Sequence, residues 1–349
     1  VRVSFSNGRD VLVTPEHPMF VEAGGEVGTV EARDVEEGAF VPAPRQLPNS
    51  ATPVDLDAEP QQGKEKDVTL PETLGPDLAE LLGLLVAEGH SYAGSSHEIG
   101  FSNQDERLLD RAARLMRSVT GMESSDTTNE AGTVTRRWIS TKLYRWFESN
   151  FPEVMQTARQ KRIPARVLGA SQEEIRRFLV GAFAGDGGIE SEAMSYSTAS
   201  DGLARDYADA LGKIGVASRI HHDTAEDTWK VYVVGDSTER FVDEVVDEAD
   251  ERRRDDLASA PRDAVSSALA EFETRARALE DGADLRYYRI TDVERVPNEG
   301  EYACDWVYDV TVEPTNTFVS EGGVLHNSIS ISKAGINATL KSRCSLLGA

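Results

Sequence analysis

Three consecutive residues near the end of the sequence, His326-Asn327-Ser328, have the chemistry to cut and join peptide bonds. The side-chain nitrogen of Asn327 can attack its own backbone carbonyl carbon, which breaks the bond to Ser328 and releases a free amine. His326 can donate the proton that this step needs. The Ser328 hydroxyl can act as a nucleophile that receives an acyl group. Such a triplet also occurs by chance, so its context decides the interpretation.

Strand signals surround this triplet and recur at the other end of the chain. Upstream of it, YDVTVEPTNTFVSEGGVLHNS has the pattern of two strands and contains Asp309. Near the beginning, VTPEHPMF places Thr14 and His17 in a strand-and-turn stretch. Simpler interpretations stay open, with His17 as an ordinary core or surface histidine and Asp309 as a plain strand residue.

A second set of reactive side chains ends two similar stretches in the middle of the chain. LLGLLVAEG (81–89) and LVGAFAGDG (179–187) each predict a helix with an internal glycine and a final carboxylate, Glu88 or Asp186. Glycine inside a helix costs about 1 kcal/mol against alanine, so close approach of two helix backbones is the expected reason for it. Two carboxylates that meet at the helix ends repel unless a cation lies between them, and Mg²⁺ prefers such oxygen ligands. The alternative is a glycine-capped helix with an incidental acid.

Those stretches resemble the motifs of the LAGLIDADG homing endonuclease family, in its two-motif single-chain form. KRIP (161–164), ahead of the second stretch, is similar to the same family. The resemblance implies a saddle of two antiparallel sheets that lies along double-stranded DNA. It also implies Mg²⁺ held by Glu88 and Asp186, with Lys161 in a catalytic position near the scissile phosphate. The other interpretation of Lys161 is a surface charge before a helix.

Arginine-rich stretches fit contacts with DNA phosphates. The DNA-binding candidates are Arg136, Arg137 and Arg162. No clear second lysine follows the second repeat, where Lys213 and Lys230 are nearest. An inactive, DNA-binding-only domain is therefore the alternative to an active endonuclease.

The two strand-rich ends together resemble the intein family, whose splicing needs no cofactor. TPEHP is similar to its Thr-x-x-His block, and YDVTVEPTNTFV with GGVLHNS to its C-terminal blocks. The resemblance implies an all-β, horseshoe-like splicing domain that carries the endonuclease as an insert. It assigns the catalytic roles: Thr14 and His17 activate the N-terminal scissile bond, Asp309 and His326 assist, Asn327 cyclises, and Ser328 is the nucleophile that follows the intein.

Two features separate this sequence from the full intein pattern. The first block of the family, with its Cys or Ser nucleophile, would precede Val1. Splicing is therefore expected to need an upstream segment of the same precursor. Asn316 stands where the family often has an assisting histidine.

The stretch SISISKAGINATLKSRCSLLGA (328–349) resembles the minichromosome maintenance (MCM) replicative DNA helicase family. The resemblance implies that the intein interrupts a hexameric, ATP-dependent helicase and that Lys333 contacts DNA. The sequence contains no Walker A motif, so ATP would be used only by the host outside this chain. The alternatives are an amphipathic tail, or a helicase fragment with an inert insert.

These patterns predict a mixed fold, in which an all-β splicing domain is split by an α/β endonuclease domain. FSNQDERLLDRAARLM and YSTASDGLARDYADAL follow the two glycine-containing stretches, which predicts two copies of one α/β unit and a pseudo-twofold domain. In chain order, the expected segments are 1–45 (splicing domain, N-terminal part), 46–75 (linker), 76–250 (endonuclease, with repeats at about 76–160 and 161–250), 251–284 (charged helical arm), 285–327 (splicing domain, C-terminal part) and 328–349 (start of the helicase).

The chain of 349 residues has a formal net charge of −24, with 61 acidic and 37 basic residues. Such a charge affects solubility rather than fold, and it is typical of a halophilic archaeal protein, in which high salt screens self-repulsion. An ordinary acidic protein with a charged helical arm is the alternative. Two cysteines do not make a disulfide framework. No apolar run reaches membrane-spanning length and no signal peptide is visible, so a cytoplasmic location without a membrane partner is expected.

Overall fold

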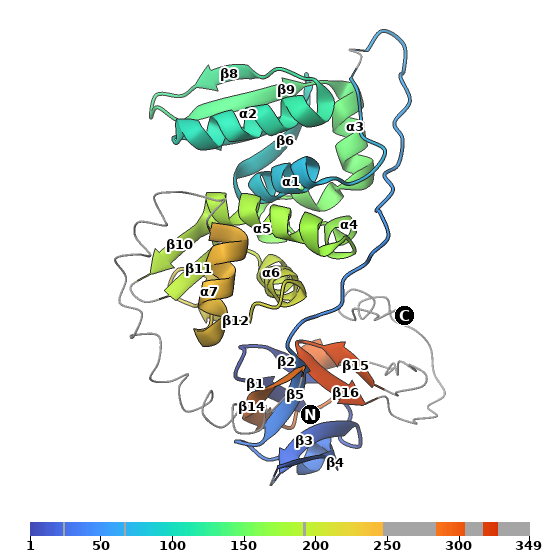
Figure 1. Ribbon diagram of the computed structural model, residues 1–349, viewed down its shortest axis with the longest axis vertical. Coiled ribbons are helices and arrows are strands. Elements are labelled where there is room, and N and C mark those ends of the chain that lie inside the picture. The colour runs from blue at the N-terminus through green and yellow to red at the C-terminus, as the bar shows by residue number, and fades with distance from the viewer. Residues whose placement is uncertain (24, 66–67, 191–192, 247–283, 304–316, 327–349) are drawn as a thin grey trace. The chain divides into compact units, whose positions relative to one another are not determined.

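The computed structural model describes residues 1–23, 25–65, 68–190, 193–246, 284–303 and 317–326 (Figure 1). The chain forms two compact units, one of residues 1–46 with the C-terminal segments and one that begins at Leu47. Outside the described residues lie the predicted arm up to residue 283 and the residues Asp309, Asn316, Asn327, Ser328 and Lys333.

The first unit, called the β unit below, is an antiparallel sheet with eight strands in the described part of the chain. Its strand order is β15-β16-β3-β5-β14-β1-β2, and β4 pairs with β3. The strands are β1 (Arg2–Phe5), β2 (Asp10–Leu12), β3 (Pro18–Ala23), β4 (Glu26–Glu31), β5 (Phe40–Pro44), β14 (Leu285–Glu294), β15 (Thr317–Ser320) and β16 (Gly323–His326). Strands from the two ends of the chain are therefore neighbours, while the predicted horseshoe shape stays a prediction.

Alternating side chains explain why the β unit has a core. In β1, Val3 and Phe5 are buried, whereas Arg2 and Ser4 are partly exposed. Val3 and Phe5 belong to an apolar cluster that also contains Met19, Ile290 and Leu325. A turn at Asn7-Gly8 connects β1 to β2, and Gly8 has the positive φ of 78° that glycine adopts without strain.

The second unit, called the α/β unit below, repeats one order of elements. The first copy contains α1 (Pro76–Glu88), β6 (Gly89–Ala93), β7 (His97–Asn103), α2 (Glu106–Thr120), β8 (Ser125–Thr128), β9 (Val134–Ile139) and α3 (Thr141–Asn150). After the short α4 (Ala165–Leu168), the second contains α5 (Gln172–Asp186), β10 (Gly187–Glu190), β11 (Ala193–Thr198), α6 (Asp201–Lys213), β12 (Ser218–Asp223), β13 (Thr228–Val233) and α7 (Thr238–Phe241). The sheets have matching orders, β6-β7-β9-β8 and β10-β11-β13-β12. The predicted repeat is thus present, and a twofold relation between its copies stays a prediction.

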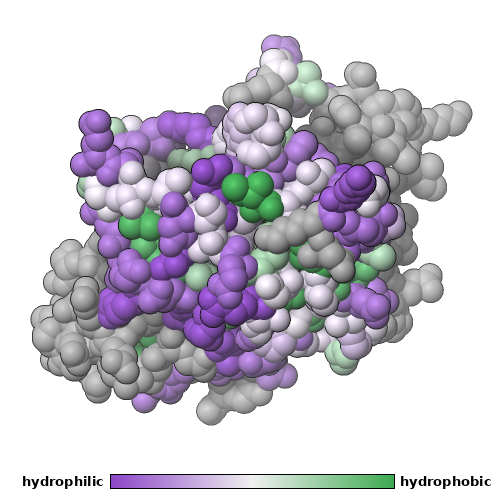
Figure 2. Space-filling model, turned by 90° about the horizontal axis from the view of Figure 1, so that it is seen from above, coloured by the Kyte–Doolittle hydropathy of each residue, from purple (hydrophilic) through white to green (hydrophobic). Residues whose placement is uncertain are grey.

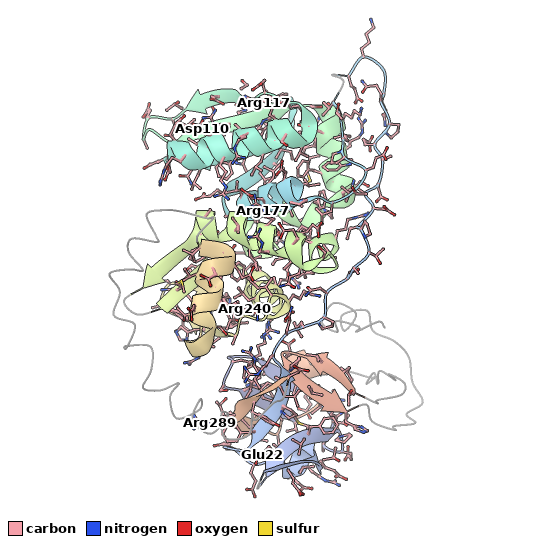
Figure 3. The ribbon with its side chains drawn as sticks, in the orientation of Figure 1. Glu22, Asp110, Arg117, Arg177, Arg240 and Arg289 are labelled. Carbon is pink, nitrogen blue, oxygen red and sulfur yellow. The ribbon has the colours of Figure 1, made fainter. Side chains whose placement is uncertain are left out.

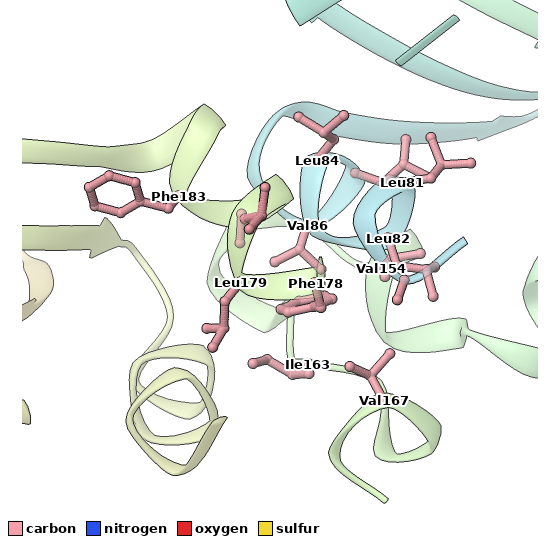
Figure 4. Close-up of a cluster of buried hydrophobic side chains, with 14 of the residues drawn as sticks. Leu81, Leu82, Leu84, Val86, Val154, Ile163, Val167, Phe178, Leu179 and Phe183 are labelled. Carbon is pink, nitrogen blue, oxygen red and sulfur yellow. The ribbon is translucent and has the colours of Figure 1, made fainter. Parts of the chain in front are cut away.

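Small residues let α1 and α5 approach closely. A Cβ atom at Gly83 would overlap the Phe178 carbonyl oxygen, and one at Gly181 would overlap the Glu80 carbonyl oxygen. Apolar side chains of both helices are buried around this crossing, as Figure 4 shows for Leu81, Leu82, Leu84, Val86, Phe178, Leu179 and Phe183. The close approach predicted from the two glycines is therefore confirmed.

The segment that connects the β unit to α1 packs on the α/β unit. Leu56, Val68 and Leu74 are buried in its core. The Asn150 side chain of α3 accepts a hydrogen bond from the Asp57 backbone N–H at 2.7 Å and donates one to the Asp57 carbonyl oxygen at 3.0 Å. The described parts of the stretch expected as a linker therefore pack against the α/β unit.

The surface of the molecule is mostly polar in the view of Figure 2. Figure 2 shows a face on which polar side chains predominate and apolar ones form small separate groups. In the described ranges, no helix is both long and apolar enough to span a bilayer.

Candidate functional site

The predicted carboxylates lie at the C-terminal ends of the crossing helices. Glu88 is the last residue of α1 and Asp186 the last residue of α5, and both are partly buried. The ends are close, because a Cβ at Gly185 would overlap the Ala87 Cβ and come within 3.6 Å of the Glu88 Cγ. The packing of small residues therefore brings the two acidic helix ends together.

Glu88 is partly buried and has one amide donor. The Asn103 side chain at the end of β7 donates a hydrogen bond to Glu88 Oε1 at 3.1 Å. Burial raises the pKa of Glu88, and the nearby Lys161 acts in the opposite direction. A carboxylate that is costly to ionise gains most from a bound cation.

Lys161 lies beside both carboxylates and is 6% exposed. Its Nζ donates hydrogen bonds to the carbonyl oxygens of Leu85, Val86 and Gly89, at 2.9, 2.8 and 2.7 Å. These carbonyls end α1, where a cation also interacts favourably with the helix dipole. Burial lowers the pKa of Lys161 to about 8, although Asp186 and Glu88 act to raise it. A surface charge is therefore not the explanation of Lys161.

Arg162 anchors the stretch that carries Lys161. Its guanidinium donates to both Asp206 carboxylate oxygens at 2.6 and 2.5 Å, and the Ile163 backbone N–H donates to the same carboxylate at 3.1 Å. Burial raises the pKa of Asp206, whereas the Arg162 contact opposes that effect. Arg162, predicted as a DNA contact, thus has a positioning role that fixes the neighbouring lysine to α6.

The first sheet places Arg136 and Arg137 on opposite faces. Arg136 pairs with the fully buried Phe101, and its guanidinium contacts carboxylates on α2 and β8: Glu106, Asp110 and Asp126. It therefore lies on the face that α2 covers. Arg137 pairs with Gly100 on the other face, where its guanidinium donates to Glu98 at 3.0 and 2.6 Å. The two guanidinium groups therefore lie on opposite faces of the sheet, and each is paired with carboxylates.

Tyr196 is a residue near the carboxylates that the sequence did not indicate. It is fully buried, it stacks on Tyr207 with ring centroids 4.0 Å apart, and its hydroxyl has no hydrogen-bond partner among the described residues. Its strand partner is Gly187, directly after Asp186. Burial, and next the charge of Asp186, raise the pKa of Tyr196 well above its ordinary value. In the first repeat, Gly89 corresponds to Gly187, and its strand partner is Phe101, which has no hydroxyl. Alignment of the two repeats could therefore have singled out the Tyr196 hydroxyl.

A hollow of about 780 Å³ beside α2 is rich in arginine but does not favour an anion. Its lining includes Arg107, Arg111, Arg114, Arg117, Arg136 and Arg177; Figure 3 labels Arg117 on α2 and Arg177 on α5. Among the described residues, all of these except Arg114 contact a carboxylate. The buried Glu80 alone accepts from both Arg111 and Arg177. These carboxylates offset the positive charge of the hollow.

In the β unit, the predicted residues from the two ends of the chain come together. The His17 backbone N–H donates to the Thr14 carbonyl oxygen at 3.0 Å, and the His17 residue is 9% exposed. Leu325 of β16 pairs with Met19 of β3 in antiparallel register, so His326 comes to the position opposite Pro18, next to His17. The His326 ring also lies 5.4 Å from the Phe20 ring.

The strands of the β unit come from both ends of the chain, and the α/β unit lies between them in sequence. The model of one family, the intein splicing domain, matches residues 1–327. The chain therefore belongs to the intein splicing domain family, and the resemblance found in its sequence is confirmed.

Curated relatives share parts of this chain. The replication factor C small subunit of Methanocaldococcus jannaschii is 25% identical, over 66% of this chain and 11% of its own length. The replication factor C small subunit of Pyrococcus horikoshii is 26% identical, over 70% of this chain and 24% of its own length. The chain thus spans a quarter or less of these relatives.

Among solved structures, mesophilic variants of the homing endonuclease I-DmoI match with a TM-score of 0.41 and 17% identity, over 49% of this chain and 96% of theirs. The homing endonuclease I-WcaI bound to its DNA recognition sequence matches with a TM-score of 0.40 and 14% identity, over 52% of this chain and 85% of its own. Both scores are below 0.5, too low to decide the function of the α/β unit.

Proposed function

We propose that this chain performs protein splicing through its β unit and cuts double-stranded DNA through its α/β unit. Membership of the intein splicing domain family supports splicing. The observation that carries DNA cleavage is the close packing of the helix ends that carry Glu88 and Asp186, with Lys161 buried against the end of α1.

The proposed splicing reaction starts from an upstream nucleophile of the same precursor, which forms an ester or thioester with help from Thr14 and His17. The Ser328 hydroxyl oxygen attacks this bond and takes over the upstream acyl group. The Asn327 side-chain nitrogen then attacks the Asn327 carbonyl carbon, which forms a succinimide and breaks the bond to Ser328, while His326 protonates the leaving amine. That amine attacks the ester carbonyl and forms the final peptide bond.

The intact mass of the purified chain, followed for hours in high KCl, tests the C-terminal step. We expect the peptide 328–349 to be released and the remainder to end in a succinimide or asparagine. Asn327→Ala is the matched variant, because it removes only the attacking nitrogen. Stable wild-type mass, even after the upstream segment has been added, would contradict the proposal.

The proposed DNA cleavage uses Mg²⁺, which Glu88 and Asp186 would hold. The described residues contain no group of three or more acidic, His or Cys side chains for a metal. Mg²⁺ fits this site, since it takes one or two carboxylates and fills its other positions with water and substrate phosphates. When bound, the ion would polarise the scissile phosphate. Lys161 favours the ionised form of Glu88, as ligation requires.

Cleavage of a plasmid that carries the host gene without the insertion tests this activity. We expect double-strand cutting by the wild type and loss of cutting in Glu88→Gln. Glu148→Gln is the control, because Glu148 is exposed on α3 and lies outside the site. A wild-type chain that binds this DNA without cutting it would instead support a DNA-binding-only domain.

We further propose that the host protein is an MCM helicase, in which Lys333 contacts DNA. Support comes only from the resemblance of residues 328–349, which follow the segment that the family matches. The sequence of the complete gene tests this: the upstream part should encode a Walker A motif. A different enzyme on both sides of the element would contradict it.

A further inference from the structure

The hairpin that carries His326 has an unusual turn. β15 and β16 pair from Thr317↔His326 to Ser320↔Gly323, which leaves a two-residue loop of Glu321 and Gly322. Both loop residues have positive φ, 50° and 85°. Such turns favour Asn-Gly, because a residue with a bulky side chain is strained at positive φ. Glu321 therefore needs a compensating contact.

Two residues from the opposite end of the chain provide that contact. The Asn7 side-chain amide donates to the Glu321 carbonyl oxygen at 3.1 Å, and its own oxygen accepts from the Arg9 backbone N–H at 3.0 Å. The Arg9 guanidinium lies 3.8 Å from the Glu321 carboxylate, with side chains 5% and 10% exposed. A Cβ at Gly322 would come within 2.9 Å of the Asn7 amide nitrogen, so the two turns touch.

The register of the hairpin against the rest of the sheet rests on few strand pairs. Among the described residues, β16 has one register pair with β3, Leu325↔Met19. A slip of one residue would turn every side chain of β16 to the other face, including His326. The contact of Asn7 and Arg9 with Glu321 fixes the opposite end of the hairpin and so opposes such a slip.

We propose that Asn7, Arg9 and Glu321 form a positioning clamp, which holds His326 in the register that C-terminal cleavage requires. The clamp joins the N-terminal and C-terminal parts of the splicing domain. Glu321 at positive φ lowers the stability of the turn, but its contacts with Asn7 and Arg9 fix the location of the His326 imidazole. This inference rests on the proposed splicing function.

Three variants test the clamp in the full chain. Glu321→Asn gives the turn its favoured Asn-Gly pair but removes the partner of Arg9, and Arg9→Met removes the other partner. The exchanged pair R9E/E321R restores opposite charges. Glu26→Asn, at an exposed carboxylate of the β3–β4 hairpin, is the matched control. The measurements are the release rate of peptide 328–349 and amide hydrogen exchange in residues 317–326.

We expect the first two variants to release the peptide roughly tenfold more slowly, since small misplacement of a catalytic group costs rate. The exchanged pair should recover part of the rate, and E26N should match the wild type. Wild-type release by E321N would overturn the clamp, because a purely structural turn is improved by asparagine. If the wild type releases nothing even after the upstream segment has been added, the splicing proposal fails, and hydrogen exchange alone decides on the clamp. Faster exchange at Leu325 in R9M, reversed in the exchanged pair, supports the clamp, and unchanged exchange refutes it.

Discussion

The two units assemble their candidate sites by different means. In the α/β unit, Glu88 and Asp186 end two helices whose backbones touch through glycines, so side-chain volume at the crossing sets the site. In the β unit, His17 directly precedes β3 and His326 ends β16, and these strands come from opposite ends of the chain, so strand register sets the site. A change of side-chain volume should therefore damage the site of the α/β unit, and a change of strand register should damage the site of the β unit.

The largest effect is expected from a larger side chain at the crossing of α1 and α5. Gly181→Val would force a side chain into the Glu80 backbone, where overpacking costs about 1–3 kcal/mol or more. We expect the α/β unit to lose stability by at least this amount, with loss of DNA cleavage and unchanged release of peptide 328–349. Thermal unfolding checks the effect, and Gly188→Val is the control, because a Cβ there meets no atom within 4 Å. Parallel loss of peptide release would show that the units are not independent.

The next effect concerns the stability of the folded chain, which should depend on pH because Lys161 is buried. Its pKa is lowered to about 8 in the folded chain against 10.5 for an ordinary lysine, so the unfolded chain binds more protons between these values. The free energy of unfolding should therefore increase with pH across this window, by about 3 kcal/mol at most. Chemical denaturation of the wild type and Lys161→Met at several pH values measures it, and the difference between them should grow from pH 8 to pH 10.5. A difference that is flat or falls would refute the burial of this amine.

A substitution of Asp186 at the end of α5 separates the effect on DNA cleavage from the effect on stability. Asp186→Asn should reduce the rate of DNA cleavage at least roughly a hundredfold, because it removes an anionic metal ligand. Stability without metal should be unchanged or higher, since two carboxylates no longer approach each other. Thermal unfolding with and without Mg²⁺ is the readout, and Mg²⁺ should stabilise the wild type only. Equal stabilisation of both proteins would exclude Asp186 as a ligand.

The sequence predicted the elements of the α/β site better than its contacts. Glu88 and Asp186 were visible because a glycine-containing helix and its final acid are local patterns. The burial of Lys161 was not, because its carbonyl partners lie 72 to 76 residues away. The separate faces of Arg136 and Arg137 depend on strand register, which neighbouring arginines do not reveal. Tyr196 was not predicted as a site residue, because an aromatic residue in a strand indicates a core position. The sequence does not show where its hydroxyl lies.

The smallest predicted effect distinguishes the two faces of the first sheet. Arg137→Ala should weaken DNA binding by about tenfold or less and lower the slope of log affinity against log salt by about one, as loss of one phosphate contact does. Arg136→Ala should leave that slope unchanged, because this guanidinium lies on the face that α2 covers, where it contacts Glu106 and Asp110. Fluorescence anisotropy over a salt series measures both variants. If Arg136 changed the slope and Arg137 did not, DNA would approach the face of the sheet that α2 covers.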